Sequence, residues 1–95
     1  SAASLAKAQW MVNGSTSATS VSMDGTTVAV NGSGYPLADS SGIQQAMQGT
    51  QGYNFTPAAP ATTGTAIFSP ANGGSATCQV EYTAGNGQVT VQSAC

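Results

Sequence analysis

The residues that could do chemistry are few, and two of them are cysteines near the C-terminus. The chain has 95 residues, and its only cysteines are Cys78 and Cys95. Two cysteines form a disulfide when the fold brings their Cα atoms to within about 7 Å of each other. An even cysteine count with a plausible pairing points to an oxidising compartment. The first chemistry to expect is therefore a crosslink.

Catalysis and metal binding lack their usual residues. The chain contains no His, which removes the ordinary catalytic triad and the imidazole metal ligand. Its three carboxylates, Asp24, Asp39 and Glu81, stand singly, without the paired spacing of acid–base catalysis. The sequence therefore predicts that the protein is not an enzyme, and it indicates no cofactor and no metal.

The composition restricts the partners. At 95 residues the chain is one small domain, and only 4% of its residues are charged, against about 25% in a typical globular protein. The net charge of −2 provides no basic footprint for nucleic acid, and it causes little repulsion between copies of the chain. The sequence has neither a long apolar run nor a signal peptide, so we expect that a secreted chain has lost an N-terminal segment.

Strand patterns lie next to both cysteines. Residues 78–83 and 89–92 alternate between apolar and polar side chains, which is the period of half-buried strands. Between these runs, Gly85-Asn86-Gly87 allows the chain to reverse. The pattern predicts a C-terminal hairpin.

Parity along this hairpin decides which way the thiols point. If the valines face inward, both thiols face inward too, and a register with Tyr82 roughly opposite Val91 brings Cys78 near Cys95. We therefore predict a disulfide between these two cysteines, worth about 3 kcal/mol in the chain-entropy model. The alternative is two unrelated buried thiols.

The N-terminal residues 1–13 predict a helix with two apolar stripes, followed by Gly14 as a stop signal. One stripe consists of Leu5, Ala8 and Val12, and the other consists of Ala3, Ala6 and Trp10. A surface helix needs only one stripe, so one of the two is expected to meet another molecule. We take Ala3, Ala6 and Trp10 as the candidate subunit-contact face, with Trp10 partly exposed. The alternative is that Trp10 folds back onto its own domain. The abrupt start at Ser1 fits a helix cut in the middle.

The remainder of the chain reads as strands and loops. A hairpin is predicted over residues 21–30, with Asp24-Gly25 as its two-residue turn. Asp39 or Ser40 can cap a short helix that runs to Met47. Residues 49–65 are expected to be mostly loop, and residues 66–68 a short strand. The order predicts an α+β fold, in which the N-terminal helix packs on an antiparallel sheet and a disulfide closes the C-terminal loop.

The aromatic residues suggest one rival function. Trp10, Tyr35, Tyr53 and Tyr82 could bind sugars if they were exposed beside amide side chains. In a small domain with few aromatic residues, core positions are the more common use. A secreted carbohydrate-binding module is therefore the alternative from another class, and surface glycans are candidate ligands.

Several short motifs, in this order, resemble the globular domain of bacterial type IV pilins, most closely the mannose-sensitive haemagglutinin branch. They are residues 28–36 (VAVNGSGYP), then Ser41-Gly42-Ile43, then the ending with Cys78, Val80, Tyr82, Val89, Val91 and Cys95. The resemblance covers most of the chain from Gly14 onward, and the very low charge departs from the family pattern.

The resemblance implies a single pilin-like domain over residues 1–95, with residues 1–13 as a helix stub and 14–95 as the loop and sheet region. The hydrophobic helix that begins a pilin would be missing, and it would provide the only contact with a membrane. The implied function is a structural subunit of a pilus in surface attachment, located outside the cell after an inner-membrane stage. Its partners would be copies of the same or related subunits. The same fold also serves pseudopilins of type II secretion systems.

Overall fold

The computed structural model describes residues 1–14, 19–47 and 52–95, and it has an α+β fold. The first helix, α1 (Ala2–Val12), begins where the sequence predicts a helix. The Ser1 hydroxyl accepts a hydrogen bond from the Ser4 N–H (3.2 Å), which satisfies one of the free donors of the first turn. The helix ends at Asn13, and Gly14 follows with φ 108°.

A two-stranded antiparallel sheet follows the helix. Strands β1 (Ser20–Met23) and β2 (Thr26–Ala29) pair with Val21 opposite Val28. Asp24 has φ 51° and Gly25 has φ 78°, which are the two positive values that a tight hairpin turn requires. The predicted turn at Asp24-Gly25 is confirmed.

The second helix is shorter than predicted. Helix α2 (Ile43–Ala46) begins after Gly42, and no side chain caps it. Asp39 Oδ1 instead accepts hydrogen bonds from the N–H groups of Ser41 (2.9 Å) and Gly42 (3.0 Å). The prediction that Asp39 or Ser40 caps a helix was therefore wrong, because the Asp39 carboxylate stabilises a separate turn before the helix.

The C-terminal half forms a four-stranded antiparallel sheet in the order β3-β4-β5-β6. Its strands are β3 (Tyr53–Thr56), β4 (Thr65–Pro70), β5 (Cys78–Thr83) and β6 (Gln88–Ser93). Strand β3 lies inside the region predicted as loop, and residues 48–51 before it lie outside the described residues. Its pattern Tyr-Asn-Phe-Thr alternates as a strand should, so the prediction undervalued this signal next to the prolines that follow.

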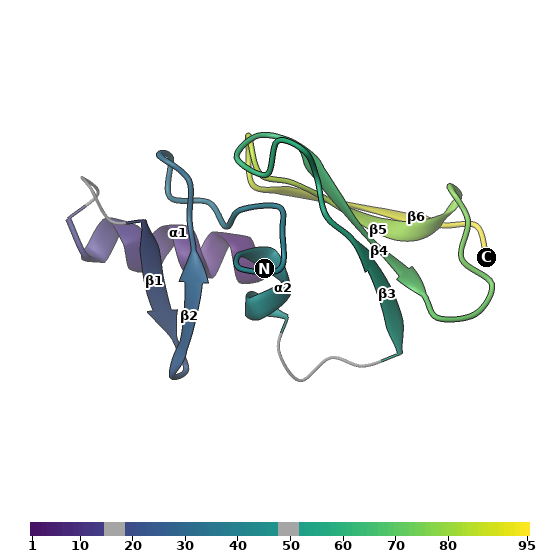
Figure 1. Cartoon of the computed structure of the whole chain (residues 1–95), viewed down its shortest axis with the longest axis horizontal. Coiled ribbons are helices and arrows are strands. Elements are labelled where there is room, and N and C mark those ends of the chain that lie inside the picture. Colours follow the sequence, from purple (N-terminus) through teal and green to yellow (C-terminus); the bar gives the residue numbers. More distant parts are fainter. Residues whose placement is uncertain (15–18, 48–51) are drawn as a thin grey trace.

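The elements form two halves side by side, which Figure 1 shows along the long axis of a body measuring 42 × 24 × 19 Å. The hairpin half consists of α1, β1 and β2, and its buried cluster is Ala6, Trp10, Val21, Val28 and Val30. The sheet half consists of α2 and β3–β6, and its buried cluster is Ala3, Ala38, Ile43, Ala66, Phe68, Tyr82 and Ala84. Helix α1 joins the halves, because its first turn contributes to one cluster and its middle to the other.

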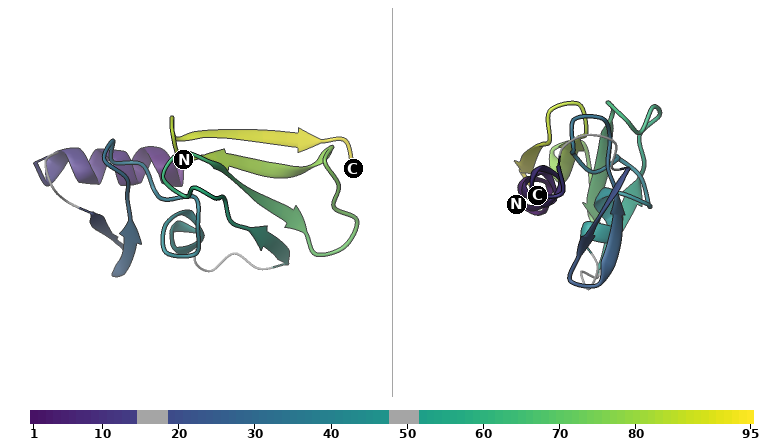
Figure 2. Two further views of the ribbon diagram at one scale, coloured as in Figure 1. Left: turned by 45° about the horizontal axis from the view of Figure 1, so that its top comes forward. Right: turned by 90° about the vertical axis from the view of Figure 1, so that its left-hand side faces the viewer.

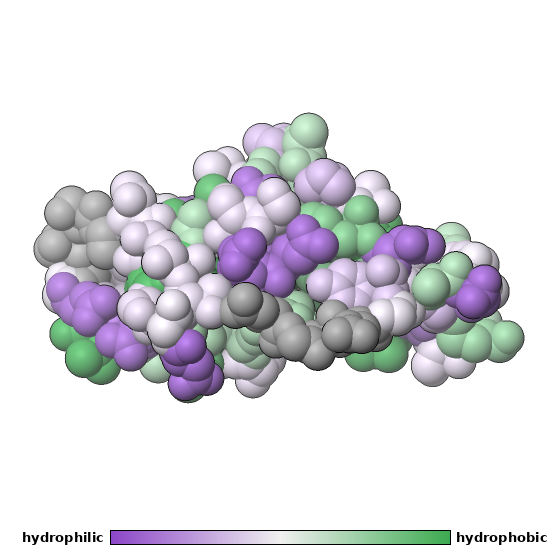
Figure 3. Space-filling view, turned by 60° about the horizontal axis from the view of Figure 1, so that its bottom comes forward, coloured by the Kyte–Doolittle hydropathy of each residue, from purple (hydrophilic) through white to green (hydrophobic). Residues whose placement is uncertain are grey.

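The two further views place α1 more closely. Its N-terminal end points toward the four-stranded sheet, and β6 forms an outer margin of that sheet (Figure 2). One face of the molecule is coloured mostly as neutral to hydrophilic, with separate hydrophobic patches (Figure 3). Of the helices that the structure describes, none is long and apolar enough to span a bilayer.

Candidate functional site

The predicted contact face of α1 is buried inside the protein itself. Ala3 and Ala6 are 1% and 0% exposed, and Trp10 is 8% exposed. Ala6 and Trp10 pack against Val21 and Val28 of the hairpin. The prediction that this face is underpacked and meets a neighbouring subunit was therefore wrong. The alternative, in which Trp10 folds back onto its own domain, is the arrangement found.

Small residues on this face have a physical reason. Alanine side chains let the strands approach the helix axis closely, and Trp10 then fills the wider space at the other end. Gly34, with φ 84°, lies against the Trp10 ring so closely that a Cβ there would overlap the indole. The position of the Trp10 ring therefore requires a glycine at position 34.

The ammonium group of Lys7 lies over the Trp10 ring. Lys7 Nζ lies 4.8 Å from the centroid of the Trp10 ring and 4.9 Å from that of Tyr35, and it donates a hydrogen bond to the Ser33 carbonyl. Each cation–π contact at such a site contributes about 0.5–1 kcal/mol. The Trp10 Nε1 is buried without a hydrogen-bond partner. The only lysine of the chain is thus committed to structure, and it adds no free positive charge for a ligand.

The opposite side of α1 is an apolar surface. We name it the outer stripe, and it consists of Leu5, Ala8, Met11 and Val12. Leu5, Met11 and Val12 are 61%, 58% and 82% exposed, and Ala8 is exposed as well. At 100° per residue these positions span about 120° of the helix surface, centred almost opposite the buried face. The helix thus has two stripes as expected, but the stripe that packs on its own domain is the one with Ala3, Ala6 and Trp10.

The hydrophobicity of the two stripes did not show which of them would be buried. Leu5 and Val12 are more hydrophobic than Ala3 and Ala6, so hydrophobicity alone favoured burying the wrong face. The usable signal was Trp10, because the largest apolar side chain of a small domain is costly to leave in water. Met11 lay between the stripes in the sequence pattern, and the structure assigns it to the exposed side.

The predicted disulfide between Cys78 and Cys95 is confirmed, with a Cα–Cα distance of 4.8 Å. Its setting differs from the prediction in register, because Cys78 lies opposite Ser93 and Tyr82 lies opposite Val89. Cys95 follows the end of β6 and is exposed, whereas Cys78 is 2% exposed. The expectation that both thiols face the core was therefore only half right, and the bond ties the exposed terminus to a buried strand.

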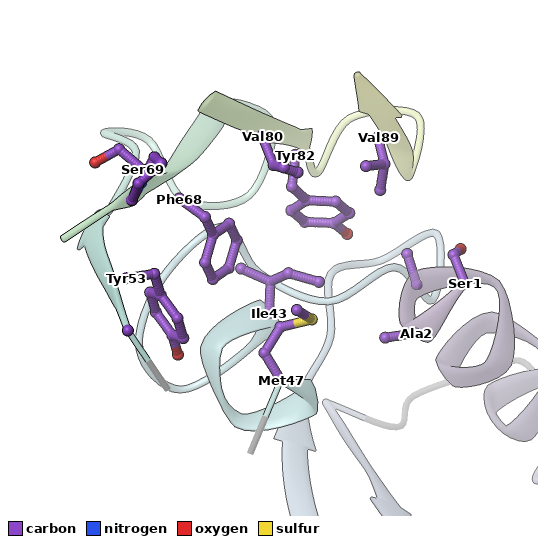
Figure 4. A pocket seen from close by; sticks show the side chains of 13 residues that line it. Ser1, Ala2, Ile43, Met47, Tyr53, Phe68, Ser69, Val80, Tyr82 and Val89 are labelled. Carbon is purple, nitrogen blue, oxygen red and sulfur yellow. The ribbon is translucent and has the colours of Figure 1, made fainter. Parts of the chain in front are cut away.

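The sheet half contains an apolar groove of about 560 Å³. It lies between the first residues of α1, the helix α2 and one face of the sheet, and Ile43, Met47, Tyr53, Phe68 and Val89 are among its lining residues (Figure 4). Such a lining can hold apolar groups.

Tyr82 is a titratable residue of the groove wall, and its pKa is shifted. Its hydroxyl donates a buried hydrogen bond to the Pro36 carbonyl (2.7 Å). Burial of the phenol, and next the proximity of Tyr35, raise the pKa of Tyr82 well above its ordinary value. The phenol is therefore neutral, and its hydrogen bond connects the sheet to the loop before α2. Because its pKa is raised, it is a poor proton donor to any ligand.

The carboxylates lie in three separate places. Asp24 is in the hairpin turn, Asp39 caps the turn before α2, and Glu81 on β5 accepts a hydrogen bond from the Gln79 amide (2.8 Å). Within residues 1–14, 19–47 and 52–95, no three His, Cys, Asp or Glu side chains gather where a metal ion could bind. The structure thus offers surfaces for contact, of which the outer stripe is the candidate site.

Comparison of the chain with family models, with curated proteins and with solved structures finds no match. Any function must therefore be argued from the residues, their placement and the sequence resemblance.

Proposed function

We propose that this protein is a structural subunit of a bacterial type IV pilus and acts in surface attachment. The observation that carries the proposal is the two-sided helix α1. Its inner face is buried against its own domain, and its outer stripe leaves Leu5, Met11 and Val12 exposed. A filament subunit needs this arrangement, because its helix must hold its own domain on one side and neighbouring helices on the other.

The outer stripe replaces the buried face as the candidate subunit contact. Exposed Leu, Met and Val side chains along one face of a helix gain free energy when a neighbour covers them, at about 25 cal/mol per Å² of apolar area. Gln9 and Asn13 lie beside the stripe and bond to each other (3.1 Å). The one charged side chain of the helix, Lys7, is held over the Trp10 and Tyr35 rings outside the stripe. Copies of the chain can therefore approach without like-charge repulsion.

The remaining features of the proposal follow from the sequence resemblance. An apolar helix before residue 1 would anchor the subunit in the inner membrane before assembly and would continue α1 in the filament. The disulfide between Cys78 and Cys95 suits a domain on an exposed cell-surface fibre, since it stabilises a small domain in an oxidising environment. A pseudopilin of a type II secretion system has the same fold and is the nearest alternative.

Burial of the aromatic side chains argues against the sugar-binding alternative. Trp10 and Tyr82 are 8% and 1% exposed, so neither ring offers a face on which a sugar could stack. Tyr53 and Phe55 each pack against Phe68, with ring centroids 5.3 and 4.9 Å apart. These aromatics therefore favour the structural role over a carbohydrate-binding module.

The proposal is tested by placing a charge on the outer stripe. Leu5→Glu, introduced into the complete gene product in its native host, should abolish or thin surface filaments seen by electron microscopy, because it puts an unpaired carboxylate in a dry helix contact. The same change in the 95-residue domain should alter its free energy of unfolding by no more than about 0.5 kcal/mol, since Leu5 is exposed.

Thr27→Glu is the matched control, because it adds the same charge at an exposed position on β2, away from the helix. This variant should assemble normally. Normal filaments with Leu5→Glu and also with Val12→Glu would refute the proposed contact, and a gene product that never forms filaments in its wild-type form would refute the pilus assignment itself.

A further inference from the structure

Strand β6 (Gln88–Ser93) ends the four-stranded sheet, and among the described residues it pairs only with β5. In Figure 2 it runs along the outer margin of the sheet, with no described segment drawn beyond it. An edge strand presents a row of backbone N–H and C=O groups that can pair with another strand.

The hydrogen bonds of the strand end show which groups point outward. The Ala94 N–H donates to the Thr77 carbonyl (2.8 Å), which places the backbone groups of Ala94 on the side of β5. Bonding direction alternates from residue to residue along an antiparallel strand. The backbone groups of Thr90 and Gln92 therefore face β5, and those of Val89 and Val91 face away from it.

This edge lacks the features that usually prevent pairing. Natural edges are blocked by charged side chains, proline, bulges or very short strands. The six residues of β6 include no charged residue, no Pro and no Gly, and Val89 and Val91 are 46% and 64% exposed. At the other margin, β3 has only four residues and is followed by Pro57, and the chain then bonds to the segment before α2 through Ala58 and Ala38 (2.9 Å).

We propose that the β6 edge is a pairing surface for a second copy of this chain, which adds its own β6 in antiparallel orientation. Of the registers that align the outward backbone groups, we propose the one that places Val89 opposite Val91 of the second copy, with Thr90 on the two-fold axis, because it pairs both valines of each strand with valines. Gln88 then lies opposite Gln92 of the second copy. From Gln88 to Gln92 each side chain thus faces one of the same kind, and Ser93 faces Gly87. Cross-strand pairs of like type stabilise a sheet by about 0.2–1 kcal/mol each.

Charge and shape favour a second copy over a different protein. An antiparallel strand is complementary to itself, and neutral side chains on both strands leave no electrostatic basis for preferring another partner. Val89 also lines the apolar groove, so pairing would extend that apolar surface across two molecules. The contact is two-fold and closes as a pair. It does not build a filament, and it does not depend on the helix contact proposed above.

Sedimentation of the 95-residue domain over a concentration series tests the pairing. We expect a monomer–dimer equilibrium, and Val91→Lys should raise the dissociation constant by about tenfold or more, because it replaces two cross-strand valine pairs by symmetry. Thermal unfolding should show that Val91→Lys stays folded, since Val91 is an exposed residue. A domain that remains monomeric at about millimolar concentration would overturn the proposal.

A crosslinking pair of variants tests the register. Thr90→Cys should form a disulfide between two copies, because residues on the axis of a non-hydrogen-bonded pair bring their Cβ atoms to about 5 Å. Gln88→Cys is the matched control, on the same strand and also exposed, and it should not crosslink because two such sites would lie about four residue steps apart. Peptide mapping would verify that Cys78–Cys95 stays intact.

Two outcomes would reject the proposal. Equal crosslinking of Thr90→Cys and Gln88→Cys would show random collision instead of a defined register. A dimer that Leu5→Glu dissociates, but Val91→Lys does not, would place the contact on the helix. That second result would leave the pilus proposal standing and remove only the β6 contact.

Discussion

In the hairpin half, the apolar residues lie between one helix and two strands. In the sheet half, they lie on one face of four strands that a single short helix covers only in part. The buried cluster of the hairpin half includes Trp10, which Lys7 and Gly34 cover from outside. The sheet half leaves Val89 and Val91 exposed and an open groove beside them. The buried cluster of the hairpin half is thus covered, whereas that of the sheet half is partly open to solvent.

The difference shows where this domain needs support other than packing. The hairpin half holds a tight turn and a closed cluster, and it contains no crosslink. The sheet half carries the disulfide at its C-terminal edge, and Tyr82 connects it to the loop before α2. A small domain buries a limited share of its surface, so its hydrophobic core supplies limited stability. Crosslinks typically add stability in the parts of such a domain that are less well packed.

The largest effect is expected from a charge introduced into the buried cluster of the hairpin half. Ala6 is 0% exposed, so Ala6→Glu buries a carboxylate without a partner and should lower the free energy of unfolding by about 3–5 kcal/mol. Ala8→Glu adds the same group to the same helix on its exposed side, and it should change this free energy by at most about 0.5 kcal/mol. Urea unfolding of both variants measures the difference, and equal losses would mean that the two faces of α1 are not distinct.

The second largest effect on stability is expected in the sheet half, from removal of the disulfide. Replacing Cys78 and Cys95 together by Ala removes a crosslink between residues 17 positions apart, which should cost about 3 kcal/mol through the added freedom of the unfolded chain. Hydrogen exchange should then show faster exchange in β5 and β6 than before, with little change in β1 and β2. Ser93→Ala, an exposed change in the same strand, serves as the control. Uniform loss of protection over both halves would contradict the idea that the crosslink supports only the sheet half.

A smaller effect is expected in the turn of the hairpin half. Gly25 has φ 78° and no neighbouring atom within 4 Å of a Cβ placed there, so Gly25→Val is limited by backbone strain alone. It should destabilise by roughly 1 kcal/mol or more. Gly32→Ala is the control, since Gly32 also has open space around it but no positive φ. Equal melting temperatures for Gly25→Val and the wild type would exclude the tight turn at Asp24-Gly25.

Local signals predicted much of this fold. The end of α1, the Asp24-Gly25 turn and the C-terminal hairpin each depend on residues close in sequence, such as Gly14 as a stop. Such signals are visible in the chain itself because the interactions that satisfy them are short-range.

Long-range packing set the parts that were predicted incorrectly. The buried face of α1 depends on distant residues such as Gly34, which lies 24 positions after Trp10 and leaves room for its ring. The register of β6 differs by two residues from the predicted one, because the chain reverses over residues 84–87 and Thr83 pairs with Gln88. Neither fact can be read from one segment, since each depends on which distant residue the fold brings beside it.

The smallest expected effect tests the contact between the four-stranded sheet and the loop before α2. Tyr82→Phe removes the hydrogen bond to the Pro36 carbonyl and should cost about 1 kcal/mol at neutral pH. Alkaline pH gives a second signature, because burial raises the pKa of Tyr82 in the folded protein above its unfolded value of about 10. Below about pH 10 the phenol keeps its proton in both states, so it adds no pH dependence.

Above that pH, the unfolded chain loses the Tyr82 proton while the folded protein keeps it. The unfolded state then binds fewer protons, so the free energy of unfolding falls as pH rises. Tyr82→Phe lacks this group, and its stability should decline less steeply, which narrows the gap to the wild type above about pH 10. Urea unfolding of both proteins across this range provides the comparison, with Tyr53→Phe as the control on a half-buried tyrosine in the same sheet. Parallel pH profiles for the wild type and Tyr82→Phe would mean that the phenol ionises as easily in the folded protein as in the unfolded chain, and that the contact between Tyr82 and the Pro36 carbonyl is open to water.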